Sequence, residues 1–304
     1  MTEVADNILV GSASWTDKTL LACGRFYPPE AKTAEARLRY YASQFPLVEV
    51  DSSYYGLPTA ANARLWAERT PAHFTFNVKA FRLFTGHAAD PICLPKDIQQ
   101  ALPAPVPRSL DLEDLAPELQ AELWRRFIEA LAPLREAGKL GAVHFQFSPR
   151  VKRSREGFTL VERAAGRMAG HLLAAEFRHR SWFDGDEAID STLAFQRELG
   201  LVHTVVDSPQ GFPNCVPCVW AVTNPALALV RLHGRNRATW NISHAKASSS
   251  RFDYWYSADE LGAMVPEVRH LAAQARRVHV VFNTNNEDQG QVNARLMRQV
   301  LTAA

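Results

Sequence analysis

Eight short apolar segments, each ending in ionisable or amide side chains, recur along this chain with helix-like apolar spacing between most of them. Alternation of a short apolar strand with a helix is typical of a parallel sheet, and eight such units predict a closed (β/α)₈ TIM-type barrel. A length of 304 residues suits one such barrel, so we predict a single domain over residues 1–304. The predicted strands are Ile8–Ser14, Leu47–Ser52, Phe74–Lys79, Ala142–Phe147, Leu172–Arg178, Leu201–Asp207, Leu227–His233 and Val278–Asn283.

Two of the connections are predicted to be long loops. Ala80–Ala116 follows the third strand and contains five prolines, which interrupt regular structure, and Gly234–Ser257 follows the seventh strand. Loops of this length in a compact domain are usually lids or binding loops. The segment Ser208–Pro225 has no helical pattern. The predicted helices are Ala34–Phe45, Ala60–Glu68, Glu118–Ala137, Thr159–Met168, Glu187–Glu198, Ala258–Arg276 and Gln289–Leu301.

Bulk composition narrows the possible partners. The chain is 47% hydrophobic and 22% charged with a formal net charge of +2, so its overall charge requires neither nucleic acid nor an anionic membrane. It has no uninterrupted apolar run of about eighteen residues, so we expect no spanning helix and no membrane partner. Residues Met1–Asn7 are acidic and polar, unlike a secretory signal, and a cytoplasmic location is the expectation.

The four cysteines are too few for a disulfide scaffold. Cys215 and Cys218 form a C-x-x-C pair, and Cys23 and Cys93 fall in loops at the same predicted end of the barrel. A four-thiolate metal site or a redox dithiol is conceivable. Because only one two-cysteine motif exists and no thioredoxin-like context surrounds it, we expect incidental free thiols.

Polar side chains at the ends of strands two and three are candidate site residues. Glu49 and Asp51 alternate along one strand and therefore share a side, and Glu49 is either a substrate contact or a buried carboxylate paired with a base. Lys79 ends strand three, where an ammonium is costly unless it is paired or functional. Its open roles are a structural ion pair, an anion contact and a Schiff-base nucleophile. His87, in the next loop, is a candidate lid or ligand contact.

The fifth strand ends in the densest group of charges in the chain. Glu176 and Arg178 share a side, and His179 follows them directly. Neighbouring charges change each other's pKa, which suits acid/base chemistry or anion binding but also a structural ion-pair network. We interpret the group as functional because strand ends supply catalytic residues in such barrels. Asp207 ends strand six and is predicted to orient a base, bind a cation or cap a turn.

Strands seven and eight predict an anion site. Arg231 and His233 alternate in strand seven and point to the same side, while Asn283 ends strand eight just before a helix with free N-terminal amides. The loops after strands seven and eight are the recurrent anion site of this architecture. We therefore expect Arg231, Arg235 or Arg237 to hold a phosphate or carboxylate together with Asn283.

Longer motifs resemble one known family. They are GSASW with GRFYP, RLRYYASQFPLVEVDSSYYGLP, WAERTPAHFTFNVKAFRLFTGH, FQFSP, EFRHRSWF, VRLHGRN and VVFNTNN…VNARL, from about Gly11 to Leu296. In this order they resemble the YecE-like family, domain of unknown function family 72. The resemblance implies a TIM-type barrel and no established activity. The family's polar positions match Glu49, Lys79, His87, Gln146, Glu176, Arg178, His179, Asp207, Arg231, His233 and Asn283.

These residues favour an enzyme that acts on a small anionic substrate, phosphorylated or carboxylated and sugar-like, by general acid/base chemistry at the carboxyl end of the barrel. Isomerase, lyase and hydrolase reactions remain open. No cofactor is required; the alternative is a divalent metal ion held by Glu49, Glu176, Asp207 and His233. The predicted catalytic residues are Glu176, His179, His233, Lys79 and Asp207. The predicted substrate-binding residues are Arg231, Arg235, Asn283, Glu49, Tyr54, His87, Gln146 and Arg178.

A rival hypothesis is a nucleic-acid or protein binding module without catalysis. Basic clusters occur at Arg125–Arg126, Lys152–Arg155 and Arg276–Arg277, and aromatic residues alternate with arginine in the loop after strand seven. Aromatic side chains beside a basic groove are typical of single-strand binding. The alternative interpretation is that the basic clusters are solvated helix faces and the aromatic residues cover the pocket. The sequence does not predict an oligomeric state.

Overall fold

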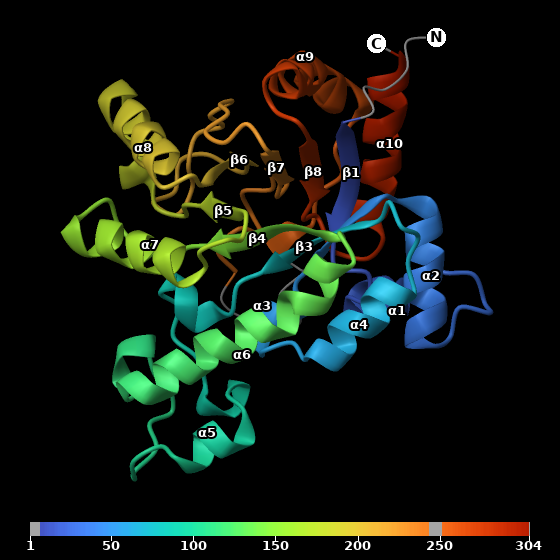
Figure 1. Ribbon diagram of the computed structural model, residues 1–304. Coiled ribbons are helices and arrows are strands. Elements are labelled where there is room, and N and C mark those ends of the chain that lie inside the picture. The colour runs from blue at the N-terminus through green and yellow to red at the C-terminus, as the bar shows by residue number, and fades with distance from the viewer. Residues whose placement is uncertain (1–6, 243–250, 304) are drawn as a thin grey trace.

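The computed structural model describes residues 7–242 and 251–303, and it contains eight parallel strands that close into a barrel in chain order. Helices surround the strands, as Figure 1 shows. The predicted (β/α)₈ fold and its eight strands are therefore confirmed. The strands are β1 Ile8–Ala13, β2 Leu47–Val50, β3 Thr75–Lys79, β4 Leu140–Gln146, β5 Leu173–Glu176, β6 Val202–Asp207, β7 Ala228–Leu232 and β8 Val278–Phe282.

The seven predicted helices are all present, with ends that differ by a few residues. They are α2 Ala34–Gln44, α4 Ala60–Glu68, α6 Pro117–Glu136, α7 Arg155–Arg167, α8 Asp186–Glu198, α9 Ala258–Gln274 and α10 Gln289–Ala303. Side-chain caps fix several of their starts: Thr33 accepts a hydrogen bond from the Ala36 amide, and Ser257 forms a capping box with Glu260. The connection between β6 and β7 has no helix, as predicted.

The loop after β3 is more regular than predicted. It contains 3₁₀ turns at Arg82–Thr85, Pro91–Cys93 and Leu112–Asp114 and the short helix α5, Lys96–Gln100. Two further short helices, α1 Lys18–Cys23 and α3 Ser52–Tyr55, were also not predicted. Elements of four to six residues are too short for a helical apolar period to appear in the sequence. The predicted loop Gly234–Ser257 includes residues 243–250, which lie outside the described residues.

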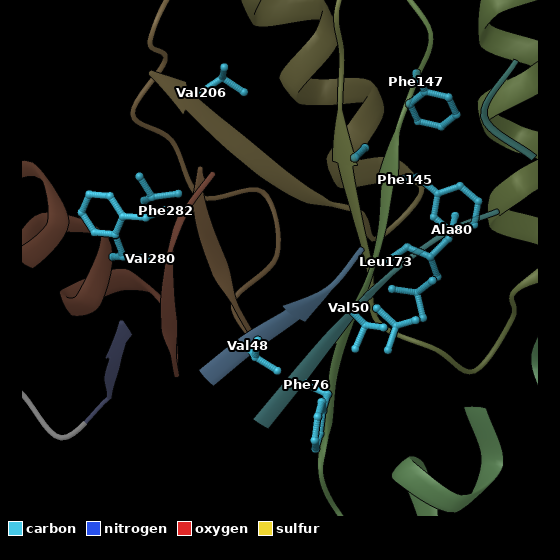
Figure 2. Packing of buried hydrophobic residues seen from close by; sticks show 14 of the residues in the cluster. Val48, Val50, Phe76, Ala80, Phe145, Phe147, Leu173, Val206, Val280 and Phe282 are labelled. Carbon is cyan, nitrogen blue, oxygen red and sulfur yellow. The ribbon is translucent and has the colours of Figure 1, made fainter. Parts of the chain in front are cut away.

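The main hydrophobic core lies between the strands and the helices. Figure 2 shows part of this layer, with Val48 and Val50 of β2, Phe76 of β3 and Phe145 of β4. Each of these side chains is at most 1% exposed. Burial of such side chains removes apolar surface from water at about 25 cal/mol per Å². No described helix is long and apolar enough to cross a membrane.

A second, smaller core fills the amino-terminal half of the barrel interior. An added Cβ on Gly11 would lie 1.9 Å from the Leu47 carbonyl oxygen, so β1 and β2 approach closely only because this residue is glycine. Period-two alternation then places polar side chains two positions further along the same strands, in the carboxyl-terminal half. The apolar residues of this inner core are Ala13, Leu47, Ala142, Ala174, Val202, Leu227, Leu229 and Val281.

Candidate functional site

A buried ion cluster occupies the carboxyl-terminal half of the barrel. Arg231 of β7 lies at its centre and donates to two carboxylates: Nη2 to Glu49 Oε1 at 2.7 Å and Nη1 to Glu176 Oε2 at 2.6 Å. All three side chains are fully buried. Burial of a carboxylate away from water costs free energy unless a positive charge compensates it. Arg231 supplies that charge for both Glu49 and Glu176.

His144 of β4 completes a ring with these carboxylates. Its Nδ1 lies 3.4 Å from Glu49 Oε2, and its Nε2 lies 3.3 Å from Glu176 Oε2. Burial lowers the pKa of His144, and the Arg231 charge lowers it further, which outweighs the two carboxylates. A neutral imidazole therefore lies between the two acidic side chains.

The protonation of His233 is fixed by its neighbours. Arg231 Nη2 donates to Asn283 Oδ1 at 3.3 Å, so the Asn283 amide nitrogen faces His233 Nδ1 at 2.9 Å. That Nδ1 must accept, which leaves the proton on Nε2, 3.2 Å from Glu176 Oε1. Burial lowers the pKa of His233 to about 3 in spite of Glu176. His233 is thus a neutral donor to Glu176.

Glu176 is held in its ionised form. Burial acts to raise its pKa, but Arg231, His233 and His144 outweigh burial and hold the pKa well below its usual value. Arg178 adds a further donor, with Nη1 at 3.2 Å from Glu176 Oε1. A carboxylate that accepts hydrogen bonds from this many donors stays ionised. Glu176 is therefore poorly suited to exchanging a proton with a substrate.

A cleft of about 510 Å³ opens above the cluster at the carboxyl end of the strands. Gln146, Arg178 and Asn283 line the cleft and also contact the cluster, so they connect the two. The other described lining residues are Asp51, Tyr54, Tyr55, Lys79, Arg82, His87, Pro149, Asn214, Trp240, Ile242, Arg251, Phe252 and Asn285.

Lys79 of β3 is a cation of the cleft wall. Its Nζ lies 3.4 Å from Asp51 Oδ1 and 4.8 Å from the centroid of the Tyr54 ring, and Arg82 packs over the same ring at 5.3 Å. Burial acts to lower the Lys79 pKa, but the carboxylates of Asp51 and Glu49 outweigh it and the pKa is raised. A charged ammonium suits the ion-pair and anion-contact roles, whereas a Schiff-base nucleophile requires the neutral amine.

Several polar atoms around the cleft are buried without a partner among the described residues. They include two donors, Trp240 Nε1 and Arg82 Nε, and one acceptor, Asn285 Oδ1. The Trp240 ring also packs on the Arg178 guanidinium at 5.0 Å. An unpaired buried polar group is costly, so these atoms belong to side chains that the packing of the cleft wall holds without full hydrogen bonding.

Asp207 and Arg235 lie outside the cleft, contrary to the prediction. Arg235 Nη2 donates to Asp207 Oδ1 at 2.9 Å, and the Tyr256 hydroxyl donates to Asp207 Oδ2 at 2.5 Å. In the sheet register Asp207 is opposite Leu232, whose side chain belongs to the outer core, so Asp207 faces away from the barrel interior. Of the arginines predicted to act with Asn283, Arg231 contacts it, whereas Arg235 pairs with Asp207.

His179 is also separate from the cluster. It precedes the 3₁₀ turn Arg180–Trp182, and its Nδ1 accepts from the Ser181 amide at 3.2 Å. His179 is also absent from the residues that line the cleft, which separates it from the proton-transfer role predicted for it. Arg237 donates to the Gln210 carbonyl rather than lining the cleft.

The predicted metal set does not come together. Asp207 is directed away from Glu49, Glu176 and His233, and the Arg231 guanidinium lies between the two glutamates, where a cation would have to bind. Within the described ranges, no three His, Cys, Asp or Glu side chains are arranged to hold a metal ion. The four thiols are free, and burial raises the pKa of Cys218 to about 12, which disfavours the reactive thiolate.

Sequence reasoning missed His144, Arg82 and Trp240. His144 could have been found, because it alternates with Gln146 along β4 and therefore faces the interior with it. Arg82 lies three residues beyond Lys79 in a 3₁₀ turn that has no clear sequence pattern. Trp240 was noted only as part of an aromatic loop.

Fold and site together define a single-domain (β/α)₈-barrel protein with a polar cleft at the carboxyl ends of its strands. The chain belongs to the family described as "Protein of unknown function DUF72", which matches residues 9–304 and confirms the resemblance seen in the sequence. It is 30% identical over 296 residues to the UPF0759 protein YunF of Bacillus subtilis (strain 168), covering 97% of this chain and 94% of that protein.

Solved structures of the family agree with the fold. A DUF72 family protein from Enterococcus faecalis V583 has a TM-score of 0.77 at 28% identity, covering 97% of this chain and 95% of that one. A DUF72 family protein from Thermotoga maritima MSB8 has a TM-score of 0.74 at 26% identity, covering 97% and 98%. None of these descriptions names an activity.

Proposed function

We propose that this protein is an enzyme that acts on a small anionic, sugar-like substrate by general acid/base chemistry in the cleft at the carboxyl end of the barrel. The observation that carries the proposal is the charge of the cleft wall. Among its described lining residues, Lys79, Arg82, Arg178 and Arg251 are cations and Asp51 is the one carboxylate. Such an excess of positive charge in a partly enclosed site attracts an anion and raises its local concentration.

The polar side chains of the cleft wall support the sugar-like part of the proposal. A polyol presents both hydroxyl donors and hydroxyl acceptors, and the wall carries acceptors on Asp51 and Asn285 and donors on Arg82. The aromatic rings of Tyr54 and Trp240 supply flat apolar surfaces beside these groups. In this proposal the cations hold the acidic group, and Lys79 stabilises negative charge that develops during reaction.

In this proposal the residues of the buried cluster do not contact the substrate. Glu176, His233 and Arg231 are fully or almost fully buried and do not line the cleft, so we assign them to positioning rather than to contact with substrate. Through Arg178, Gln146 and Asn283 they hold the cleft wall in one geometry. This is the preorganisation that electrostatic catalysis needs.

Calorimetry tests the binding half of the proposal. At low salt we expect glucose 6-phosphate and gluconate to bind and neutral glucose not to bind, with affinity falling as salt rises. Arg178→Ala should weaken binding at least about tenfold, the size of a lost charged hydrogen bond. Arg180→Ala is the matched control, because Arg180 is 60% exposed and pairs with Asp184 outside the cleft. Equal binding of glucose, or equal effects of both variants, would contradict the anion site.

Turnover tests the catalytic half. Each compound that binds is incubated with the protein and followed by proton NMR in deuterated water, which reports both new products and exchange of carbon-bound hydrogen. We expect at least one bound anion to change, and loss of the change in Lys79→Ala. Binding without any chemical change across the series would leave a binding protein and no enzyme.

The rival binding-module hypothesis has less support from the geometry. Of the loop aromatic residues, Trp240 and Tyr256 are buried at 4% and 3% exposure, whereas Trp255 is 49% exposed. Stacking of successive bases requires several exposed rings. Arg125 and Arg126 are engaged with Glu122 on their own helix. Salt-sensitive retention on single-stranded DNA, weakened by Trp255→Ala, would revive the rival.

A further inference from the structure

His87 presents an unusual imidazole to the cleft. It lies just after the 3₁₀ turn Arg82–Thr85, lines the cleft and is partly buried. Its ring packs edge-on against Tyr54 with centroids 5.3 Å apart, which restricts its orientation. Its Nδ1 is 2.9 Å from the Thr85 hydroxyl, and its Nε2 has no hydrogen-bond partner among the described residues.

The Thr85 hydroxyl determines which ring nitrogen carries the proton. A hydroxyl has one hydrogen, and Thr85 donates it to the Arg82 carbonyl at 2.9 Å. When the hydroxyl donates to that carbonyl it can only accept from His87, and this arrangement favours the imidazole proton on Nδ1. The lone pair is then on Nε2, the nitrogen without a described partner.

The charges around His87 keep it neutral while the cleft is empty. Burial lowers its pKa, and four neighbouring cations lower it further, to about 3. A base this weak removes protons poorly at neutral pH. An anion bound to the three of these cations that line the cleft would offset part of their charge and make the imidazole more basic. The cations are Lys79 of β3, Arg82 of the following turn, Arg150 after β4 and Arg178 after β5.

We propose that His87 is the general base of this site, with its tautomer fixed by Thr85 and its basicity switched on by the bound anion. The inference rests on the proposed function and replaces the earlier assignment of the base to Glu176 or His233. In the step, a substrate O–H bond breaks, an N–H bond forms at His87 Nε2, and the electron pair stays on the oxygen. No oxidant or further reactant is needed.

Histidine NMR measures both parts of this proposal without an assay of turnover. The full chain is labelled with ¹⁵N-histidine, and His87→Gln identifies the signals of His87 among the ten histidines. The nitrogen shifts report the tautomer directly, and a titration reports the pKa. Sulfate is the probe anion, because it stays doubly charged throughout the titration range.

In wild-type protein we expect the Nδ1–H tautomer and an imidazole that stays neutral down to about pH 5 in sulfate-free buffer. Saturating sulfate should raise the His87 pKa by at least two units, a hundredfold gain in proton affinity, because a smaller rise would leave the imidazole too weak a base near neutral pH. The rise should be lost in Arg178→Ala and kept in Arg180→Ala. Thr85→Val keeps the side-chain shape but removes the acceptor, so it should give a mixture of tautomers, an effect that a merely structural threonine would not have.

The possible failures are distinguishable. If sulfate produces no binding heat and no change in cleft signals, the anion site fails and the inference falls with it. If sulfate binds but the His87 pKa stays constant, or if wild-type Nε2 carries the proton, the anion site stands and the role of His87 is overturned.

Discussion

Replacement of Arg231 by methionine tests the central electrostatic argument. The side chain is fully buried and pairs with Glu49 and Glu176, which are also fully buried. Removal of one partner from a buried ion pair costs about 3–5 kcal/mol, because the remaining charge is left without compensation. Arg231→Met leaves two carboxylates in that position, so we expect a loss of stability at or above the upper end of this range at pH 7.

The pH dependence of this loss separates charge from packing. In wild-type protein the Glu176 pKa is depressed, so its stabilising contribution is present above the unfolded value and is lost as the pH falls through the folded value. Without Arg231, burial raises that pKa, and the variant folds best with the carboxylate protonated. The difference in unfolding free energy between wild type and variant should therefore grow from about pH 4 to pH 7.

Urea unfolding at several pH values provides the measurement, and a double variant provides the control. Glu176→Gln in the Arg231→Met background removes one uncompensated charge and should recover part of the stability, although Glu176→Gln alone destabilises the wild type. A cost that is the same at pH 4 and pH 7, or additive effects of the two substitutions, would show that Arg231 acts through its volume and not its charge.

Two further predictions concern the barrel itself. Gly11→Ala should lower the free energy of unfolding by at least about 3 kcal/mol or prevent folding, because the new Cβ would lie 1.9 Å from a β2 carbonyl oxygen. Gly262→Ala is the control: its Cβ would meet nothing within 4 Å, so it should be neutral or stabilising by up to about 1 kcal/mol. Equal thermal unfolding of the two variants would contradict the close approach of β1 and β2. Burial lowers the His279 pKa to about 3, so wild-type stability should fall as the pH decreases below the unfolded value near 6.5. His279→Gln should make the loss between pH 7 and pH 5 smaller by about 2 kcal/mol in urea unfolding, and an unchanged loss would refute a neutral buried histidine.

The fold was predictable because its pattern is local and repeated. Each strand is a short apolar run, and period-two alternation correctly placed Arg231 and His233 on one side of their strand, where both contact Glu176. The pattern does not show how far along the barrel a side chain lies. Glu176 and His233, two of the predicted catalytic residues, consequently lie in the carboxyl-terminal half of the barrel but beneath the cleft.

The errors in the site have identifiable causes. Asp207 ends its strand as predicted, but its register opposite Leu232 turns it outward, and a register between strands cannot be derived from one strand alone. Arg82 was missed because it lies in a 3₁₀ turn without a sequence pattern, whereas His87, a predicted ligand contact just after that turn, lines the cleft. Side chains on strands were therefore predicted better than side chains on loops.

The two layers of charge together favour one kind of ligand. Among the described residues, the cleft wall has a formal excess of three positive charges, and Arg231 with its two glutamates has an excess of one negative charge directly below. Arg178 connects the layers through Glu176, so part of the positive charge is already compensated from below. About two positive charges then remain for a ligand, which matches a phosphate monoester better than a single carboxylate. Glucose 6-phosphate should accordingly bind more tightly than gluconate in the calorimetry. The reverse order would mean that the buried Arg231–glutamate cluster does not compensate the positive charge of the cleft wall.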